Sequence, residues 1–244
     1  MRLIKLILFS LLFQIVLIGN SQQDTLLITP TNGLLDGSII RDYTNKWKVT
    51  LVKPNGEEVP NKIWTDYGQI IELEGKKYFH RVQDLYDPQM NLQDTWINMV
   101  EHKSLLPVSF TTLKPDGKFS HYQYKDNTVK GRNSLNPKDS LIVTEIDFGQ
   151  KVYDWKLYGL LLVGLPLKEG LIAKIPFSGP NSLQWLNVHV IGNETLTLPN
   201  RKKIQTWKVE TNQNITFWIS KSAPYVIKLD LQFANGAKLV WEVI

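Results

Sequence analysis

The sequence predicts an all-β protein, mainly antiparallel, whose curved sheet takes a half-barrel or barrel-like architecture with one short helix. Three observations predict this class: short segments in which apolar and polar residues alternate, turn signals between them, and one segment with helical periodicity. Regularly spaced strands joined by hairpin turns form antiparallel rather than parallel sheets. A sheet of about a dozen strands must also curl or fold over to control its edges.

Alternation of apolar and polar residues marks the strands. It is clearest at residues 225–233, where one face is expected to carry Tyr225, Ile227, Leu229, Leu231 and Phe233. Asn235-Gly236 then predicts a two-residue hairpin turn with a positive φ at Gly236. In chain order, the expected strands are residues 47–52, 63–73, 78–86, 95–102, 108–113, 119–124, 141–148, 171–177, 185–191, 204–211, 215–220, 225–233 and 239–243.

One segment, residues 152–163, lacks this alternation. Its apolar residues recur near a spacing of 3.6, at Val152, Trp155, Tyr158, Leu161 and Leu162. Asp154 in the first turn, and Gly164 and Pro166 beyond the last, are typical helix boundaries. The segment therefore predicts a short helix that covers one face of the curved sheet.

The N-terminus predicts a secretory signal peptide over residues 1–21. Arg2 and Lys5 precede an apolar run, 6–18, and small residues at positions 19 and 21 suit a cleavage site. The alternative, a transmembrane anchor, needs about 20 apolar residues. We therefore expect a single β-rich domain over residues 22–244, with a division into two sub-sheets near residues 133–139.

Composition and charge narrow the location and the partners. The chain has 244 residues, 43% hydrophobic and 21% charged, which is ordinary for a globular protein. Its lack of cysteine excludes disulfides and thiolate chemistry and suits the periplasm, secretion or the cell surface of a bacterium. Loss of the signal peptide lowers the net charge from +5 to +3, with scattered basic residues, so no nucleic-acid partner is expected. No segment after the signal peptide is apolar enough to predict an integral membrane protein.

The sequence contains no recognised catalytic motif. The serine nucleophile elbow, the zinc-protease motif and the phosphate- and dinucleotide-binding glycine loops are absent. The four histidines, expected on separate strands without metal-ligand spacing, are His80, His102, His121 and His189. We therefore predict no metal, no cofactor and no catalytic residue. A hydrolase of envelope sugars or esters, with Asp and His side chains from distant strands, is the alternative function.

Eight tryptophans, spread along the whole chain, are the remaining sequence feature that could indicate a function. They either fill the core of the curved sheet or line a concave surface for an apolar ligand. On the second reading, neighbouring strands would present a binding surface made by Trp185, Trp207, Trp218 and Tyr225. The expected partner is then a hydrophobic ligand, acyl or lipid, or an envelope protein, and the expected function is non-enzymatic binding or envelope assembly.

Several short motifs of the C-terminal half, residues 152–244, carry a family resemblance. They are Tyr153-Asp154, Leu165–Gly170, Val190–Thr195, Thr206–Glu210, Phe217–Lys221 and Val226–Leu229, with Lys103–Pro107 upstream. Together they resemble an exported bacterial family, domain of unknown function 3108. The resemblance implies an antiparallel β architecture similar to the half-barrels of lipoprotein carriers, in which helices close a curved sheet over an apolar cavity. This chain shows only one such helix, and the resemblance brings no catalytic residues.

Overall fold

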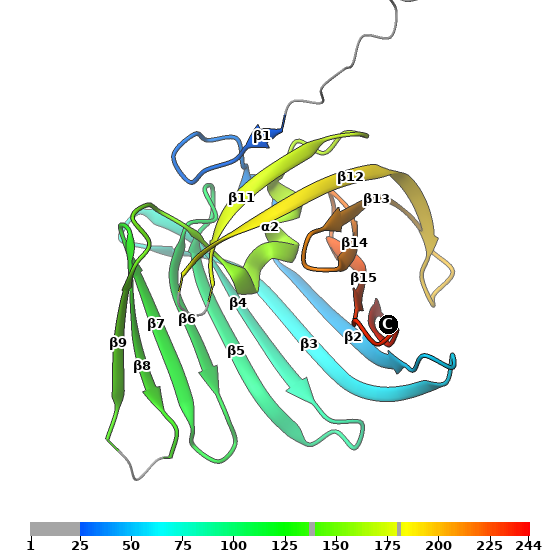
Figure 1. The fold of residues 1–244 in the computed structure, drawn as a ribbon, viewed down its shortest axis with the longest axis horizontal. Helices are drawn as coiled ribbons and strands as arrows, with labels where there is room; N and C mark the ends of the chain where they lie inside the picture. The colour runs from blue at the N-terminus through cyan, green and yellow to red at the C-terminus, as the bar shows by residue number, and fades with distance from the viewer. Residues whose placement is uncertain (1–24, 137–139, 180–181) are drawn as a thin grey trace, which may run out of the picture.

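Residues 25–136, 140–179 and 182–244 are described by a computed structural model, so the predicted signal peptide lies outside the described residues. The strands form one unclosed sheet in the order β1-β11-β12-β13-β14-β15-β16-β2-β3-β4-β5-β6-β7-β8-β9, with β10 paired to β11 (Figure 1). All neighbours pair antiparallel except β1 and β10, which run parallel to β11. The predicted fold class is confirmed: a mainly antiparallel, strongly curved sheet with one short α-helix in the described part of the chain.

The strand bounds agree with the predicted segments to within a few residues at most positions, and several strands are longer than predicted. The elements are β1 (Leu26–Leu27), η1 (Gly37–Ile39), β2 (Tyr43–Val52), β3 (Glu58–Leu73), β4 (Lys76–Tyr86), β5 (Leu92–Glu101), β6 (Pro107–Leu113), β7 (Phe119–Lys125), β8 (Thr128–Ser134), β9 (Ile142–Asp147), β10 (Tyr153–Asp154), η2 (Trp155–Leu157), α2 (Tyr158–Gly164), β11 (Ile172–Ser178), β12 (Leu183–Thr197), β13 (Lys203–Thr211), β14 (Ile215–Ile219), β15 (Val226–Gln232) and β16 (Lys238–Val243).

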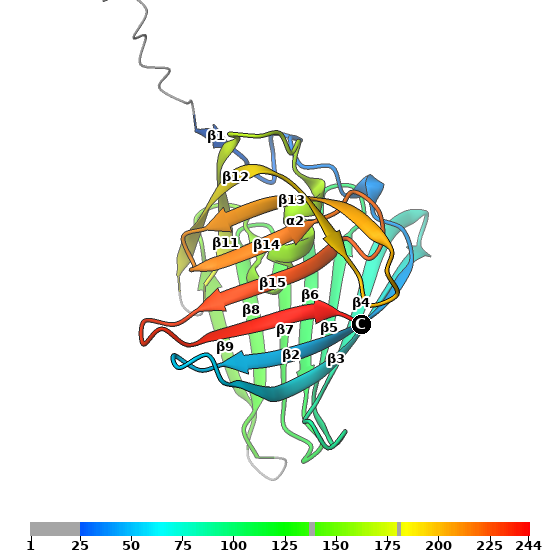
Figure 2. The same cartoon turned by 90° about the vertical axis from the view of Figure 1, so that its right-hand side faces the viewer.

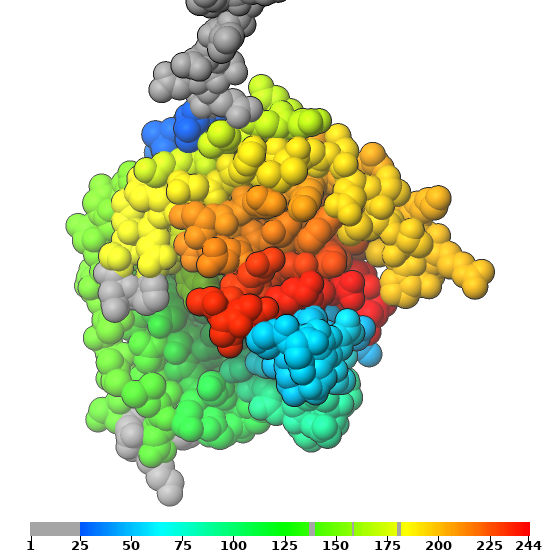
Figure 3. Space-filling view, turned by 45° about the vertical axis from the view of Figure 1, so that its right-hand side comes forward, coloured from blue at the N-terminus to red at the C-terminus, as the bar shows by residue number. Residues whose placement is uncertain are grey.

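The last strand of the chain, β16, joins the strands of the C-terminal half to those of the N-terminal half in one sheet. β16 pairs antiparallel with β2, with Trp241 opposite Val49 (Figure 2). The hairpins β15–β16 and β2–β3 therefore lie side by side at the surface (Figure 3). β8 and β9, the strands before and after residues 137–139, pair with each other; residues 137–139, part of the expected sub-sheet boundary, lie outside the described residues.

Three hairpins have the same turn conformation, which differs from the two-residue turn predicted at Asn235-Gly236. At the β15–β16 hairpin, Gly236 has the expected positive φ of 83°, but Asn235 does not. The Gly236 N–H donates to the Phe233 carbonyl, and Phe233 N–H donates to Ala237. This is a type I turn followed by a left-handed glycine, not a two-residue turn. Gly56 and Gly117 close the β2–β3 and β6–β7 hairpins with the same hydrogen bonds.

The predicted helix over residues 152–163 is shorter than expected. Tyr153–Asp154 form β10 and pair with β11, Trp155–Leu157 form the 3-10 helix η2, and only Tyr158–Gly164 form α2. The helix starts late because the Asp154 backbone is held in the sheet, while its carboxylate accepts a hydrogen bond from the Lys156 N–H. Leu160, Leu161, Leu162 and Val163 are all buried, as expected of a helix enclosed by the sheet (Figure 1).

A bulge in the β14–β15 pair changes the face of one predicted residue. Trp218 pairs with Lys228 but Ile219 pairs with Val226, so Ile227 is the extra residue. Ile227 consequently lies with Trp218 in an outer cluster and not on the inner face with Leu229. Within the described residues, no helix is long and apolar enough to cross a membrane.

Candidate ligand-binding cavity

An apolar cavity lies between the inner face of the sheet and the η2–α2 segment. Its volume is about 410 Å³, within the range of small-molecule sites. Strands β14 to β16 and β2 to β5 form one wall, and η2 with the start of α2 forms the other. The lining residues are Trp47, Trp64, Arg81, Gln83, Trp96, Trp155, Lys156, Gly159, Ile215, Phe217, Val226, Leu229, Leu231, Leu239 and Trp241.

Tryptophans from the four strands β16, β2, β3 and β5 line the sheet wall of the cavity. Trp47 and Trp64 are directly paired across β2 and β3. Trp64 meets Trp96 edge to face, with ring centroids 5.2 Å apart, and meets Trp241 in the same way at 6.0 Å. Such contacts add to the stabilisation from area burial alone. The wall is therefore preformed from large rings that hold one another in place.

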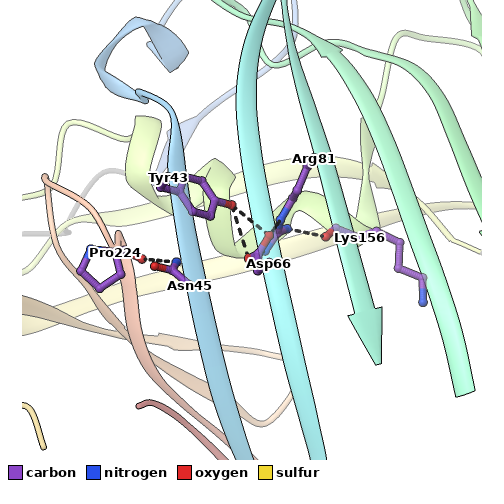
Figure 4. Close-up of polar contacts among 6 residues, drawn as sticks. All are labelled: Tyr43, Asn45, Asp66, Arg81, Lys156 and Pro224. Carbon is purple, nitrogen blue, oxygen red and sulfur yellow. Dashed lines mark hydrogen bonds and ion pairs between the residues drawn. The ribbon is translucent and has the colours of Figure 1, made fainter. Parts of the chain in front are cut away.

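Arg81 is one of two cations in the lining, and its charge is compensated. Its Nε and Nη2 donate to the two carboxylate oxygens of Asp66 at 2.9 and 2.7 Å (Figure 4). The Tyr43 hydroxyl donates to the same carboxylate at 3.3 Å, and burial raises the pKa of Tyr43. Arg81 Nη1 also donates to the Lys156 carbonyl at 3.5 Å, which connects β4 to η2. Arg81, held by Asp66, thus connects the sheet wall of the cavity to the helical wall.

Lys156 is the second cation. Its Nζ lies 3.4 Å from the ring centroid of Trp155 and 3.8 Å from that of Trp96, so the ammonium is held between two lining tryptophans. Burial lowers the pKa of Lys156 to about 8, against the attraction of the carboxylates of Asp154 and Asp94. The side chain is therefore a cation in an apolar setting.

Buried polar contacts hold both ends of the η2–α2 segment. At its start, the fully buried Asp154 accepts hydrogen bonds from Lys156 N–H at 3.0 Å and from Asn98 Nδ2 at 2.8 Å. Burial raises the pKa of Asp154 to about 6. At its end, Lys221 Nζ donates to the Val163 and Leu165 carbonyls at 2.6 and 2.5 Å. These contacts satisfy helix-end groups and fix the helical wall.

A second apolar cavity adjoins the first on the side of β11 and β12. Its volume is about 380 Å³, and it shares three lining residues with the first cavity: Trp155, Ile215 and Leu231. Phe177 and Leu186 contribute the far wall. The Trp155 ring, 39% exposed, therefore stands between two neighbouring apolar spaces.

The structure places none of the four sequence-predicted residues in the lining of the first cavity. Trp218 is on the outer face of β14, where it packs with Ile204 and Ile227, and its Nε1 donates to Glu194 at 2.8 Å. Tyr225 is 2% exposed in the main core, and its hydroxyl accepts from the Arg41 N–H at 2.7 Å. Strand alternation alone does not show which face of β14 is the inner one.

The other two predicted residues are separated from the cavity in different ways. Trp185 lies on the outer face of β12, with Lys174 Nζ 4.7 Å from its ring centroid, whereas the adjacent Leu186 points into the core. Trp207 lies on the inner face of β13 and packs against the main core, beyond the cavity. The structure therefore does not gather the four predicted side chains into one surface.

Five of the eight tryptophans line the cavity, but nothing in the sequence indicates that these five lie close together. Trp47, Trp64 and Trp96 lie on three separate predicted strands, 47–52, 63–73 and 95–102, and Trp241 lies on the last one, 239–243. The β2–β16 pairing that brings Trp241 to this group joins residues almost 200 positions apart in the sequence. The one indication of the cavity's position in the sequence is the predicted helical segment that carries Trp155, because it was expected to cover one face of the sheet.

Polar chemistry elsewhere is sparse in the described part of the chain. There, no group of three or more His, Cys, Asp or Glu side chains is placed to hold a metal ion. The His121 ring contacts the Thr111 hydroxyl at 2.8 Å across β6 and β7, and His102 contacts the Ile40 carbonyl at 2.9 Å. Both histidines lie outside the cavity lining.

Several solved structures are similar to this chain at 8–9% sequence identity. A β-barrel-like protein of domain of unknown function DUF1849 from Brucella abortus has a TM-score of 0.48, at 8% identity, with 84% of this chain and 97% of that chain covered. A candidate exported protein with a YmcC-like fold from Bacteroides fragilis has a TM-score of 0.34, at 8% identity, with 86% and 97% covered. A candidate lipoprotein from Parabacteroides distasonis has a TM-score of 0.36, at 9% identity, with 84% and 96% covered. No curated protein matches this chain.

A family profile gives the assignment that the resemblance anticipated. It matches residues 68–240, from the middle of β3 to β16, and so reaches further upstream than the motifs in residues 152–244. The matched region includes most of the cavity lining and the whole helical segment. On this match, the chain belongs to the family of proteins of unknown function DUF3108.

Proposed function

We propose that this protein is an exported, non-enzymatic binding module that holds a hydrophobic ligand, an acyl chain or lipid, in the tryptophan-lined cavity. One observation carries the proposal: a cavity of about 410 Å³ is lined by five tryptophans and six aliphatic or phenyl side chains. Ligand sites have this character, with mainly apolar walls and a few polar groups. The expected occupant is flexible, narrow and mostly apolar.

The energetics of acyl burial fit this cavity. Each buried methylene contributes about 0.8 kcal/mol, so six of them contribute about 5 kcal/mol before the entropic costs of association. The walls need little rearrangement, because the tryptophan contacts and the Arg81–Asp66 pair fix them in advance. Preorganisation of this kind lowers the cost of binding. A micromolar dissociation constant corresponds to about 8 kcal/mol, so such an affinity requires burial of about ten carbons of a medium-chain ligand.

The predicted signal peptide supports an exported location, in the periplasm or at the cell surface of a bacterium. Acyl chains and lipids are abundant constituents of that compartment and need protein surfaces to cross water. A role in envelope assembly follows from these two points: the protein would carry or sequester such a ligand outside the cytoplasm.

The hydrolase alternative receives less support from the same geometry. Among the described residues that line the cavity there is no carboxylate, histidine, serine or threonine side chain. Hydrolysis of a glycoside needs a pair of carboxylates, and ester cleavage by a serine needs a neighbouring base. Arg81 and Lys156 are the two ionisable residues of the lining, and both favour binding over hydrolysis.

The proposal is tested with decanol, a neutral amphiphile, by isothermal calorimetry and tryptophan fluorescence on the mature protein. Gly159→Leu places a side chain in the cavity from α2, where a new Cβ would meet only Val226 at 3.4 Å and Phe217 at 3.7 Å. The matched control is Gly192→Leu on β12, where the nearest atom is in Glu169 at 3.8 Å. We expect saturable binding with a Kd of about 1–100 µM, at least tenfold weaker in Gly159→Leu and unchanged in Gly192→Leu. No saturable binding by the wild type, or equal binding by Gly159→Leu, would refute the proposal.

A further inference from the structure

The cavity lining has an excess of positive charge. It contains two cations, Arg81 and Lys156, and no carboxylate among its described residues. Arg81 is neutralised by the bidentate pair with Asp66, whose side chain is 1% exposed. Lys156 has no such partner: among the ion pairs within 4.0 Å in the described residues, none involves its ammonium. One uncompensated cation therefore borders an apolar space.

The two tryptophans around Lys156 position this cation without neutralising it. Trp96 and Trp155 offer the faces of their rings at 3.8 and 3.4 Å, which attract a cation but accept no proton and carry no net charge. Asp94 and Asp154 attract the ammonium from outside the lining, and neither is within ion-pair distance. Any N–H bond of the ammonium that does not point at the two rings is therefore available for an oxygen ligand.

We infer that Lys156 recognises an anionic group at one end of the bound chain, so that the ligand is an anionic amphiphile. The inference rests on the proposed function and specifies its ligand: an alkyl chain in the tryptophan-lined cavity and a carboxylate or phosphate at Lys156. An anion there would form charge-assisted hydrogen bonds, which are about twice as strong as neutral ones. It would also remove the uncompensated charge from an apolar setting.

The test compares ligands that differ only in the head group: decanoate, decyl phosphate and decanol, with inorganic phosphate alone as the fourth probe. Calorimetry at pH 7 is expected to show at least about tenfold tighter binding of decanoate or decyl phosphate than of decanol. Inorganic phosphate should show no binding at millimolar concentration, since it lacks the chain. Equal affinities for decanoate, decyl phosphate and decanol would overturn the inference but leave the proposed function standing, whereas no binding of any alkyl probe would refute both.

Two variants separate recognition by Lys156 from a structural role. Lys156→Met keeps the length of the side chain and should reduce the preference for decanoate over decanol to near one. Lys174→Met is the matched control, because Lys174 also stacks on a tryptophan, Trp185, but outside the cavity. It should keep the full preference. An equal loss of decanoate and decanol binding in Lys156→Met, or tight binding of inorganic phosphate alone, would contradict the inference; the wild-type comparison stands even if this variant does not fold.

Discussion

The ammonium of Lys156 lies 3.8 Å from the ring centroid of Trp96. Trp96 belongs to β5 on the sheet wall of the cavity, and Lys156 to η2 on the helical wall, so this contact joins the two walls at the cavity edge. The Arg81 hydrogen bond to the Lys156 carbonyl makes a second connection at the same residue. Lys156 therefore connects the two walls of the cavity and is also the residue that we propose to bind the anionic group.

The preference for anionic ligands is expected to depend on pH. Burial lowers the pKa of Lys156 to about 8, so its ammonium is largely charged at pH 7 and largely neutral above pH 9. The charged groups that face it are Asp94 on β5, Asp154 on β10 and the paired Arg81 on β4. We expect the ratio of decanoate to decanol affinity, measured by calorimetry, to fall from pH 7 to pH 9.5. A ratio that stays constant over this interval would show that Lys156 does not carry the preference.

Asp154 is expected to make the folded state less stable as the pH rises through its titration. Burial raises its pKa from 3.8 to about 6, so between these values the folded protein binds more protons than the unfolded chain. The free energy of unfolding then decreases with rising pH, by up to about 3 kcal/mol for a shift of this size. Relative to wild type, Asp154→Asn should gain stability by about this amount between pH 4 and pH 7 in urea titrations. Asp116→Asn, at an exposed turn, is the control; parallel profiles for wild type and Asp154→Asn would contradict the expectation.

Removal of one member of the buried Arg81–Asp66 pair should destabilise the fold strongly. The remaining charge would be buried without a partner, which typically costs about 3–5 kcal/mol. We expect this loss in chemical denaturation for Arg81→Met. The double variant Arg81→Met with Asp66→Leu should lose less than the sum of the two single variants, because neither charge remains. Additive losses would show that the two side chains act independently.

Gly236→Val should destabilise the β15–β16 hairpin, because Gly236 has a φ of 83° that a β-branched residue resists. The expected loss is about 1–3 kcal/mol, measured as a lower Tm and a lower free energy of unfolding. Gly192→Val, on β12 at an ordinary φ, is the matched control. An unchanged Tm for Gly236→Val would mean that the turn adopts another conformation in solution.

Trp155→Ala should connect the two neighbouring cavities, since its ring lines both. The ring is 39% exposed, so its loss should affect ligand selection more than stability. We expect the affinity for tetradecanoate relative to decanoate to rise about tenfold, because additional methylenes gain a buried position. Trp185→Ala, on the outer face, should leave this ratio unchanged. If the ratio does not change in Trp155→Ala, the two spaces do not form one binding channel.

Much of the fold could be predicted from the sequence because its determinants are local. Alternation at residues 225–233 and the turn residues around Gly56, Gly117 and Gly236 each act within one hairpin. The prediction failed where a distant contact overrides the local pattern. Pairing of Asp154 with β11 shortens the helix, and the bulge opposite Trp218 moves Ile227 to the outer face.

The residues of the candidate cavity could not be predicted from the sequence. A tryptophan-lined concave surface was one of two interpretations of the eight tryptophans, but Trp185 and Trp218 point outward, while Trp64, Trp96 and Trp241 line the cavity. The face of a strand that lies inside depends on the direction in which the whole sheet curves. That direction is a property of the tertiary fold and cannot be predicted from the residues of a single strand.

A heavy atom on the alkyl chain would show whether this cavity holds an acyl chain with its anionic end at Lys156. A crystal structure with 10-bromodecanoate would give the position of the bromine by anomalous scattering. We expect a bromine peak among Trp64, Phe217 and Trp241, with the carboxylate within hydrogen-bond distance of Lys156 Nζ. A bromine peak on the outer face of the sheet, or density for the ligand with its carboxylate away from Lys156, would contradict it.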